Sequence, residues 1–136
     1  MALKDDYQKI DALSPLEKSQ QVQKITKEKT NFGYDNIKDI LQDLHNEINE
    51  LTEEIDVHHI NNNNIQRIFE ELGDVLFVLG NLANKYSISS HDALEYSIKE
   101  FERRIIYCEE NYNGDLKNAS NEEIIKLWKE AKKAKE

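Results

Sequence analysis

Two short acidic segments contain the residues whose types and spacing best suit chemistry. Each segment pairs two carboxylates three residues apart: Glu47 with Glu50, and Glu71 with Asp74. Residues three apart in an α-helix lie on the same face, so each pair can point in one direction. If the two helices pack side by side, the four carboxylates converge.

Such a cluster predicts a bound cation. Several adjacent carboxylates cannot all stay ionised in a partly dehydrated site unless a positive charge lies between them. Mg²⁺ prefers oxygen ligands and usually keeps part of its water shell, with the phosphates of a substrate completing the coordination. The spacing therefore indicates a magnesium site, with Mn²⁺ as the alternative metal, and phosphate chemistry.

Length and composition set the expected fold class. With 136 residues, the chain is expected to form a single domain over residues 1–136. It contains four glycines and one proline, and its apolar residues recur at helical spacing, so strands have little support. We expect an all-α bundle of about five helices, in which an antiparallel pair carries the acidic segments.

Charge and cysteine usage narrow the function classes. A net charge of −9 argues against a general nucleic-acid binder, which needs a basic surface. The single Cys108 cannot form an intrachain disulfide, and no N-terminal apolar stretch resembles a signal peptide or a membrane span. The expected location is the cytoplasm, with no membrane or nucleic-acid partner.

Capping patterns predict where helices begin. Residues 14–17 and residues 120–123 each place a glutamate three positions after a serine, which predicts a helix over 15–29 and a short last helix. Asp35 is the expected N-cap of the helix that carries Glu47. Another helix is expected to open at residues 89–92 and to end near residues 113–114.

The two acidic helices should form a hairpin. Residues 58–64 are polar and rich in asparagine, so they are expected to form the loop between them. From residue 75 to 83 the second helix is apolar nearly all round, which predicts burial on more than one side. Gly73 is expected to let the two helices approach closely.

Besides the first acidic segment, the chain carries a series of recognisable motifs: Glu70-Glu71-Leu72-Gly73-Asp74, Val75-Leu76-Phe77, Asn81-Leu82-Ala83, Phe101-Glu102-Arg103-Arg104 and Leu127-Trp128. In this order the motifs resemble the MazG family of nucleoside triphosphate pyrophosphohydrolases. The similarity runs from about Gly33 to Lys132 and is greatest to the C-terminal half of the two-domain members.

The resemblance implies an all-α fold that assembles as a tight homodimer or a dimer of dimers. It also implies hydrolysis of a nucleoside triphosphate to the monophosphate and pyrophosphate, with magnesium as the usual metal. The residues that match the family's metal ligands are Glu47, Glu50, Glu71 and Asp74.

Other residues match the family's substrate and catalytic positions. Arg104 and Trp128 match residues that contact the nucleotide, and Arg103 or Arg104 would offset negative charge as the pyrophosphate leaves. Glu50 or Glu70 would accept the proton of the attacking water, and the sequence does not rank the two.

Several positions depart from the family pattern. Asp43 and Glu100 stand where the family has lysines, Asn46 replaces the first glutamate, and Asn36 stands where a tryptophan usually follows Gly-Phe-Asp. At an effective dielectric of about 20, a charge about 4 Å from a phosphate contributes roughly 4 kcal/mol. Loss of two such charges should weaken triphosphate binding, so altered substrate choice and reduced activity are both open.

Alternative interpretations remain at this point. The apolar stripes could serve a helical dimerisation module with a degenerate site, which would show no metal dependence. A related all-α dUTPase or phosphoribosyl-ATP pyrophosphohydrolase would share the fold but not the substrate. Locally, Arg103 and Arg104 could simply pair with Glu100 or Glu102, and Trp128 could be a packing anchor.

Overall fold

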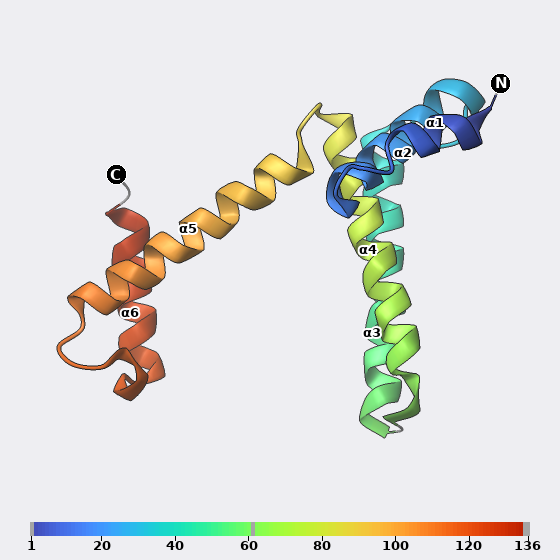
Figure 1. Cartoon of the computed structure of the whole chain (residues 1–136). Helices are drawn as coiled ribbons and strands as arrows, with labels where there is room; N and C mark the ends of the chain where they lie inside the picture. Colours follow the sequence, from blue (N-terminus) through green and yellow to red (C-terminus); the bar gives the residue numbers. More distant parts are fainter. Residues whose placement is uncertain (1, 61, 135–136) are drawn as a thin grey trace. The chain divides into compact units, whose positions relative to one another are not determined.

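A computed structural model describes residues 2–60 and 62–134, and over these residues the chain is all-α (Figure 1). The fold class predicted from the sequence is therefore confirmed. The helices are α1 (Leu3–Lys9), α2 (Pro15–Thr30), α3 (Ile37–Ile60), α4 (Ile65–Lys85), α5 (Ser90–Asn111) and α6 (Asn121–Lys133), with short 3-10 helices at Asn62–Asn64 and Leu116–Asn118. None of the described helices is long and apolar enough to cross a membrane.

The chain divides into two compact units, residues 1–91 and residues 92–136. The first unit holds α1 to α4, and the second holds most of α5 together with α6. That residues 1–136 act as one domain stays a prediction.

Serine caps begin α2 and α6 where the sequence predicts them. The Ser14 hydroxyl accepts a hydrogen bond from the Glu17 backbone N–H at 3.4 Å. Ser120 and Glu123 form a complete capping box, in which each side chain accepts the other residue's backbone N–H at 3.1 and 3.0 Å. These bonds satisfy amide groups that have no partner within the helix.

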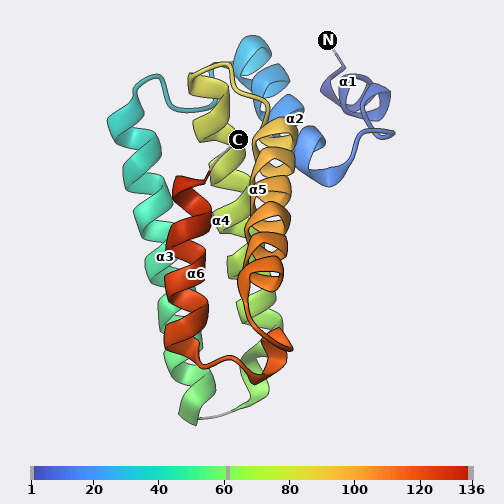
Figure 2. The same cartoon turned by 90° about the vertical axis from the view of Figure 1, so that its left-hand side faces the viewer.

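Helices α3 and α4 lie side by side as an antiparallel hairpin (Figures 1 and 2). The connection is shorter than expected, because α3 continues to Ile60 and the prediction of a loop over residues 58–60 is wrong. In the rest of the expected loop, residue 61 lies outside the described residues, and Asn62–Asn64 form a short 3-10 helix. The Asn64 amide fastens the connection to α3: it donates to the Glu54 backbone oxygen at 2.6 Å, and its oxygen lies 3.0 Å from His58 Nδ1.

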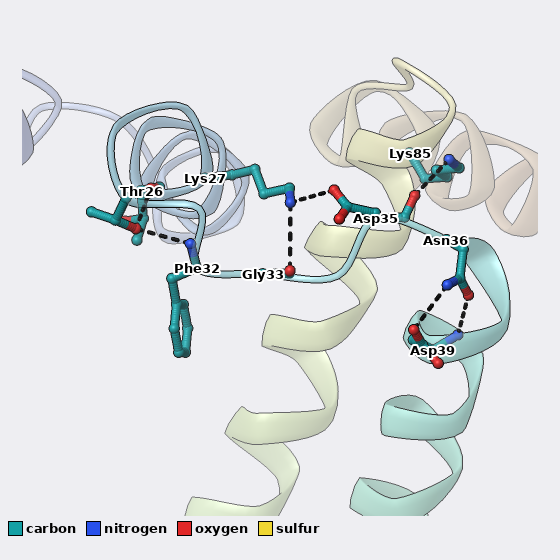
Figure 3. A network of polar contacts seen from close by, with 9 residues as sticks. Thr26, Lys27, Phe32, Gly33, Asp35, Asn36, Asp39 and Lys85 are labelled. Carbon is teal, nitrogen blue, oxygen red and sulfur yellow. Dashed lines mark hydrogen bonds and ion pairs between the residues drawn. The ribbon is translucent and has the colours of Figure 1, made fainter.

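The segment before α3 is held by two lysines (Figure 3). Lys27 contacts the Asp35 carboxylate and the Gly33 carbonyl, and Lys85 donates to the Asp35 carbonyl at 3.0 Å. Asp35 is therefore not the N-cap of α3, contrary to expectation. Asn36 takes that role, with its side-chain oxygen accepting the Asp39 N–H at 3.0 Å.

Helix α2 packs closely on α4 at Gly80, not at Gly73. A Cβ at Gly80 would lie 2.9 Å from the Ser19 hydroxyl, whereas a Cβ at Gly73 would meet nothing within 4 Å. The expectation that Gly73 allows close approach is therefore wrong within this chain. Gln20, 8% exposed, completes the contact by bonding the Asn84 side chain and the backbone of residues 88 and 90.

Burial of α4 is less extensive than its composition predicts. Val78 and Gly80 are buried, but a stripe spaced three and four residues apart is not covered by the rest of its unit. The stripe consists of Phe69, Leu72, Leu76 and Leu79, which are 71%, 49%, 50% and 40% exposed. The apolar sequence of α4 therefore exceeds what the helices of its own unit bury.

Candidate metal centre

The two acidic segments meet between α3 and α4. Glu47 on α3 and Glu71 and Asp74 on α4 each offer an oxygen, and these oxygens all lie within 4.8 Å of one another. The i, i+3 spacing along α4 and the antiparallel packing of the hairpin bring them together. Glu47 and Glu71 are half-buried and Asp74 is exposed, so the cluster is open on one side.

One oxygen of Glu47 and one of Glu71 stand out within this cluster. The Oε2 atom of each is buried and makes no hydrogen bond to any part of the chain that the structure describes. A buried carboxylate oxygen without a donor is costly, because it has lost its hydration and received nothing in return. A cation that prefers oxygen ligands fits these atoms. Among the described residues, the group that meets here consists of carboxylates and includes no histidine.

The electrostatics of the cluster point the same way. Burial, followed by the adjacent Glu50 and the charges of Asp74 and Asp43, raises the pKa of Glu47 to about 7. Burial and the same Glu50 carboxylate also raise the pKa of Glu71. Without a cation the cluster therefore favours retaining protons, and a divalent cation would restore the ionised form.

Glu50 and Glu70 occupy different positions. Glu50 is exposed, but it is near enough to Glu47 and Glu71 to raise the pKa of both, although it is not among the three residues whose oxygens cluster within 4.8 Å. Glu70 is exposed and contributes to neither pKa shift.

From the sequence, Asp43 was interpreted only as a lost positive charge and was not placed beside the carboxylate cluster. Asp43 lies one helical turn before Glu47, and its charge contributes to the raised pKa of that residue. The i, i+4 spacing was the available signal, since it places both side chains on one face of α3. Asp43 also lines a cavity beside the carboxylates, together with Gln23, Phe77 and Asn81, which the sequence did not single out as functional.

The three candidate nucleotide contacts lie together in the second unit. Arg103 donates two hydrogen bonds to Glu100, each at 3.2 Å, and a third to the Ala131 carbonyl at 3.0 Å. Arg104 donates to Glu100 at 3.4 Å and lies 5.5 Å from the centre of the Trp128 ring. Trp128 also packs against the Phe101 ring, with centroids 5.5 Å apart.

These contacts give each of the three residues a structural role. Glu100 pairs with both arginines, and Trp128 joins α5 to α6. The Arg104 Nε is buried and has no hydrogen-bond partner among the residues of the described structure. Arg104 therefore retains an unused buried donor at Nε, and Arg103 is held by three bonds within its own unit.

Comparisons with known proteins identify the family of this chain. The family model of the MazG nucleotide pyrophosphohydrolase domain matches residues 35–108, which is more than half of the chain and includes all four carboxylates. An uncharacterised protein of Bacillus subtilis (strain 168), YabN, is 42% identical over 65 residues. That alignment covers 46% of this chain but 13% of YabN, so this chain corresponds to a small part of that relative. No solved structure matches the chain significantly. The chain belongs to the MazG nucleotide pyrophosphohydrolase family.

Proposed function

We propose that this chain hydrolyses a nucleoside triphosphate to the monophosphate and pyrophosphate, in a reaction that depends on Mg²⁺ or Mn²⁺. The observation that carries the proposal is the carboxylate cluster of α3 and α4, with its two buried and unpartnered oxygens. Membership of the MazG family supplies the reaction class. We place the metal on Glu47, Glu50, Glu71 and Asp74.

The donor set supports a hard divalent cation. All four side chains offer oxygen, which Mg²⁺ and Mn²⁺ prefer, and the open side formed by Asp74 leaves access for phosphate oxygens. When bound, such a cation supplies charge neutralisation at the phosphoryl oxygens and activation of water. The hairpin contributes by fixing the carboxylates before substrate arrives.

For the proton acceptor we favour Glu50 over Glu70. Glu50 lies close enough to Glu47 and Glu71 to raise the pKa of both carboxyls, so a water beside the cluster is within its reach. Glu70 is exposed and stays the second candidate. Glu50→Gln should therefore slow turnover more than Glu70→Gln.

Substrate binding by the second unit is part of the same proposal. Arg104 has an unused buried Nε–H, and its guanidinium suits phosphate oxygens. We assign phosphate contact to Arg104, with Arg103 and Trp128 as further substrate contacts. Because Glu100 already pairs with both arginines, their affinity for phosphate should be lower than that of free guanidinium groups.

We also propose that the chain forms a homodimer or a dimer of dimers. The stripe of Phe69, Leu72, Leu76 and Leu79 on α4, which the helices of its own unit leave exposed, supports this assembly, because a continuous apolar stripe of this kind is typical of an interface. Light scattering should give twice or four times the chain mass. Leu76→Glu should shift the protein toward the monomer.

A pyrophosphate-release assay tests the proposed reaction. The panel holds the common ribo- and deoxyribonucleoside triphosphates, each with Mg²⁺ and with a chelator. The wild type should release pyrophosphate from at least one substrate only with metal, and Glu71→Gln should lose that release. Glu53→Gln, an exposed carboxylate on the same helix pair, is the matched control and should behave as wild type. Metal-independent release, or full activity in Glu71→Gln, would contradict the proposal.

A further inference from the structure

A cavity of about 480 Å³ lies beside the carboxylate cluster, within residues 1–91. It is bounded by α2, by the segment before α3, and by α3 and α4. Asp43 enters it one turn before Glu47, and Phe77 enters it one turn after Asp74. A ligand whose phosphates reach the cluster could therefore place its other end in this cavity.

The cavity combines aromatic surface with polar groups. Three rings line it, and each keeps much of its surface free: Phe32 is 78% exposed, Tyr34 45% and Phe77 44%. In Figure 3 the Phe32 ring extends away from the polar contacts that hold its segment. Exposed aromatic faces of this kind stack on nucleobases, whatever the base.

Phosphate is a poor occupant for this cavity. Its one cationic side chain, Lys27, is already engaged by the Asp35 carboxylate and the Gly33 carbonyl. The other charged side chain in the lining of this cavity is the negative Asp43, which has no hydrogen bond or ion pair with another described residue. A neutral group with hydrogen-bond donors fits this environment better.

The polar lining presents acceptors. The Gln23 amide nitrogen donates to the Ser19 carbonyl at 3.0 Å and to the Phe77 carbonyl at 2.8 Å, which uses both of its hydrogens and leaves Oε1 as an acceptor. Asn81 lines the same cavity and makes no hydrogen bond within the described part of the chain. A larger cavity of about 790 Å³ adjoins it, but Gln20 and Asn84 there bond each other, and Lys85 bonds the Asp35 carbonyl.

We infer that this cavity receives the base of the nucleotide, and that the Asp43 carboxylate and the Gln23 side-chain oxygen select bases with an amino group at C4 of a pyrimidine or at C6 of a purine. Cytosine and adenine nucleotides would then be preferred over uracil and hypoxanthine nucleotides, whose keto oxygen at the equivalent position would face an acceptor. The inference rests on the proposed function for the position of the phosphates. A matched acceptor and amino pair discriminates bases by about tenfold to a hundredfold.

The test has one arm that needs neither metal nor catalysis. Cytidine and uridine, and adenosine and inosine, are titrated separately into ¹⁵N-labelled protein in chelator, and amide shifts are followed at Gly33, Tyr34 and Asn81. Cytidine and adenosine should shift these amides at lower concentration than their keto partners. A keto nucleoside that binds as well as its amino partner would overturn the inference.

The second arm compares kcat/KM for CTP against UTP and for ATP against ITP. The wild type should prefer the amino substrate by about tenfold or more, and Asp43→Asn should bring both ratios toward one, because an amide can also donate to a keto oxygen. Asp56→Asn, exposed on the same helix, is the matched control and should keep the wild-type ratios.

The two arms separate this inference from the proposed function. Hydrolysis with equal rates within each pair would overturn the base preference while the pyrophosphohydrolase activity stands. Absence of hydrolysis, with nucleoside binding that prefers the amino partner in the wild type and loses that preference when Asp43→Asn is titrated in the same way, would support the cavity assignment and contradict the proposed reaction.

Discussion

The metal-free protein should lose stability as the pH rises from about 5 to about 8, and Glu47 is the main reason. Burial and the adjacent Glu50 raise its pKa from 4.5 to about 7. The native state therefore holds this proton more tightly than the unfolded chain does. The contribution of Glu47 to stability is fully present below its pKa in the unfolded chain, and it is lost as the pH rises through its pKa in the folded protein.

The size of the effect follows from the shift. One pKa unit corresponds to about 1.4 kcal/mol, so full ionisation of Glu47 should lower the free energy of unfolding by roughly 3 kcal/mol. Most of this loss, about 2 kcal/mol, falls between pH 5 and pH 8. Glu71, whose pKa is also raised, changes stability in the same direction. Asp35 acts in the opposite direction, because Lys27 lowers its pKa, and its contribution is lost only below about pH 4.

Urea unfolding followed by circular dichroism, in chelator and across this pH range, measures the effect. Glu47→Gln should remove most of the pH dependence and should be more stable than the wild type at the alkaline end. Glu53→Gln, exposed on α3, should keep the wild-type slope. A stability that is constant or increases with pH in the wild type, or a Glu47→Gln variant with an unchanged slope, would refute the reasoning.

Three further predictions concern helix packing, a buried hydrogen-bond network and a helix cap. Gly80→Ala should destabilise the protein by about 1 to 3 kcal/mol in urea unfolding, because the added Cβ would meet the Ser19 hydroxyl. Gly73→Ala should be neutral or stabilising by up to about 1 kcal/mol, because nothing lies near its Cβ position. Equal losses of stability in the two variants would contradict the close contact between α2 and α4. Gln20→Ala should cost about 3 kcal/mol, since it removes bonds to three groups at the end of α4, and a loss below about 1 kcal/mol would show that these bonds contribute little. Ser120→Ala should cost about 1 kcal/mol through loss of the capping box, and Ser120→Asp, which restores an acceptor, should recover most of it.

Local sequence patterns predicted most helix boundaries, because the groups that decide them are close in the chain. Ser14 and Ser120 each accept an amide three residues later, and the pattern alone reveals this. The end of α3 was predicted wrongly, because the Asn64 amide reaches back to Glu54 over ten residues. Asp35 looked like a cap, but Lys27 and Lys85 engage it from other helices.

The carboxylate cluster was predictable for a similar reason. Two i, i+3 pairs on neighbouring helices need one antiparallel contact to converge. Three of the four residues, Glu47, Glu71 and Asp74, form the group, whereas Glu50 does not belong to it. The close contact at Gly80 was not predictable, because it depends on where α2 crosses α4, and nothing in the local sequence distinguishes it from Gly73. The cavity of Asp43 and Gln23 likewise requires three separate segments to meet.

The most direct test of the central claim is a calorimetric titration of Mg²⁺ near pH 7, repeated in buffers of different ionisation enthalpy. If the carboxylates bind the ion, binding should release the proton held by Glu47, whose pKa is about 7, and the release should disappear above about pH 9. Replacing both Glu47 and Glu71 with Gln should abolish binding. Mg²⁺ binding that releases no proton near pH 7, or that persists unchanged in the double variant, would contradict the assignment of the metal to this cluster.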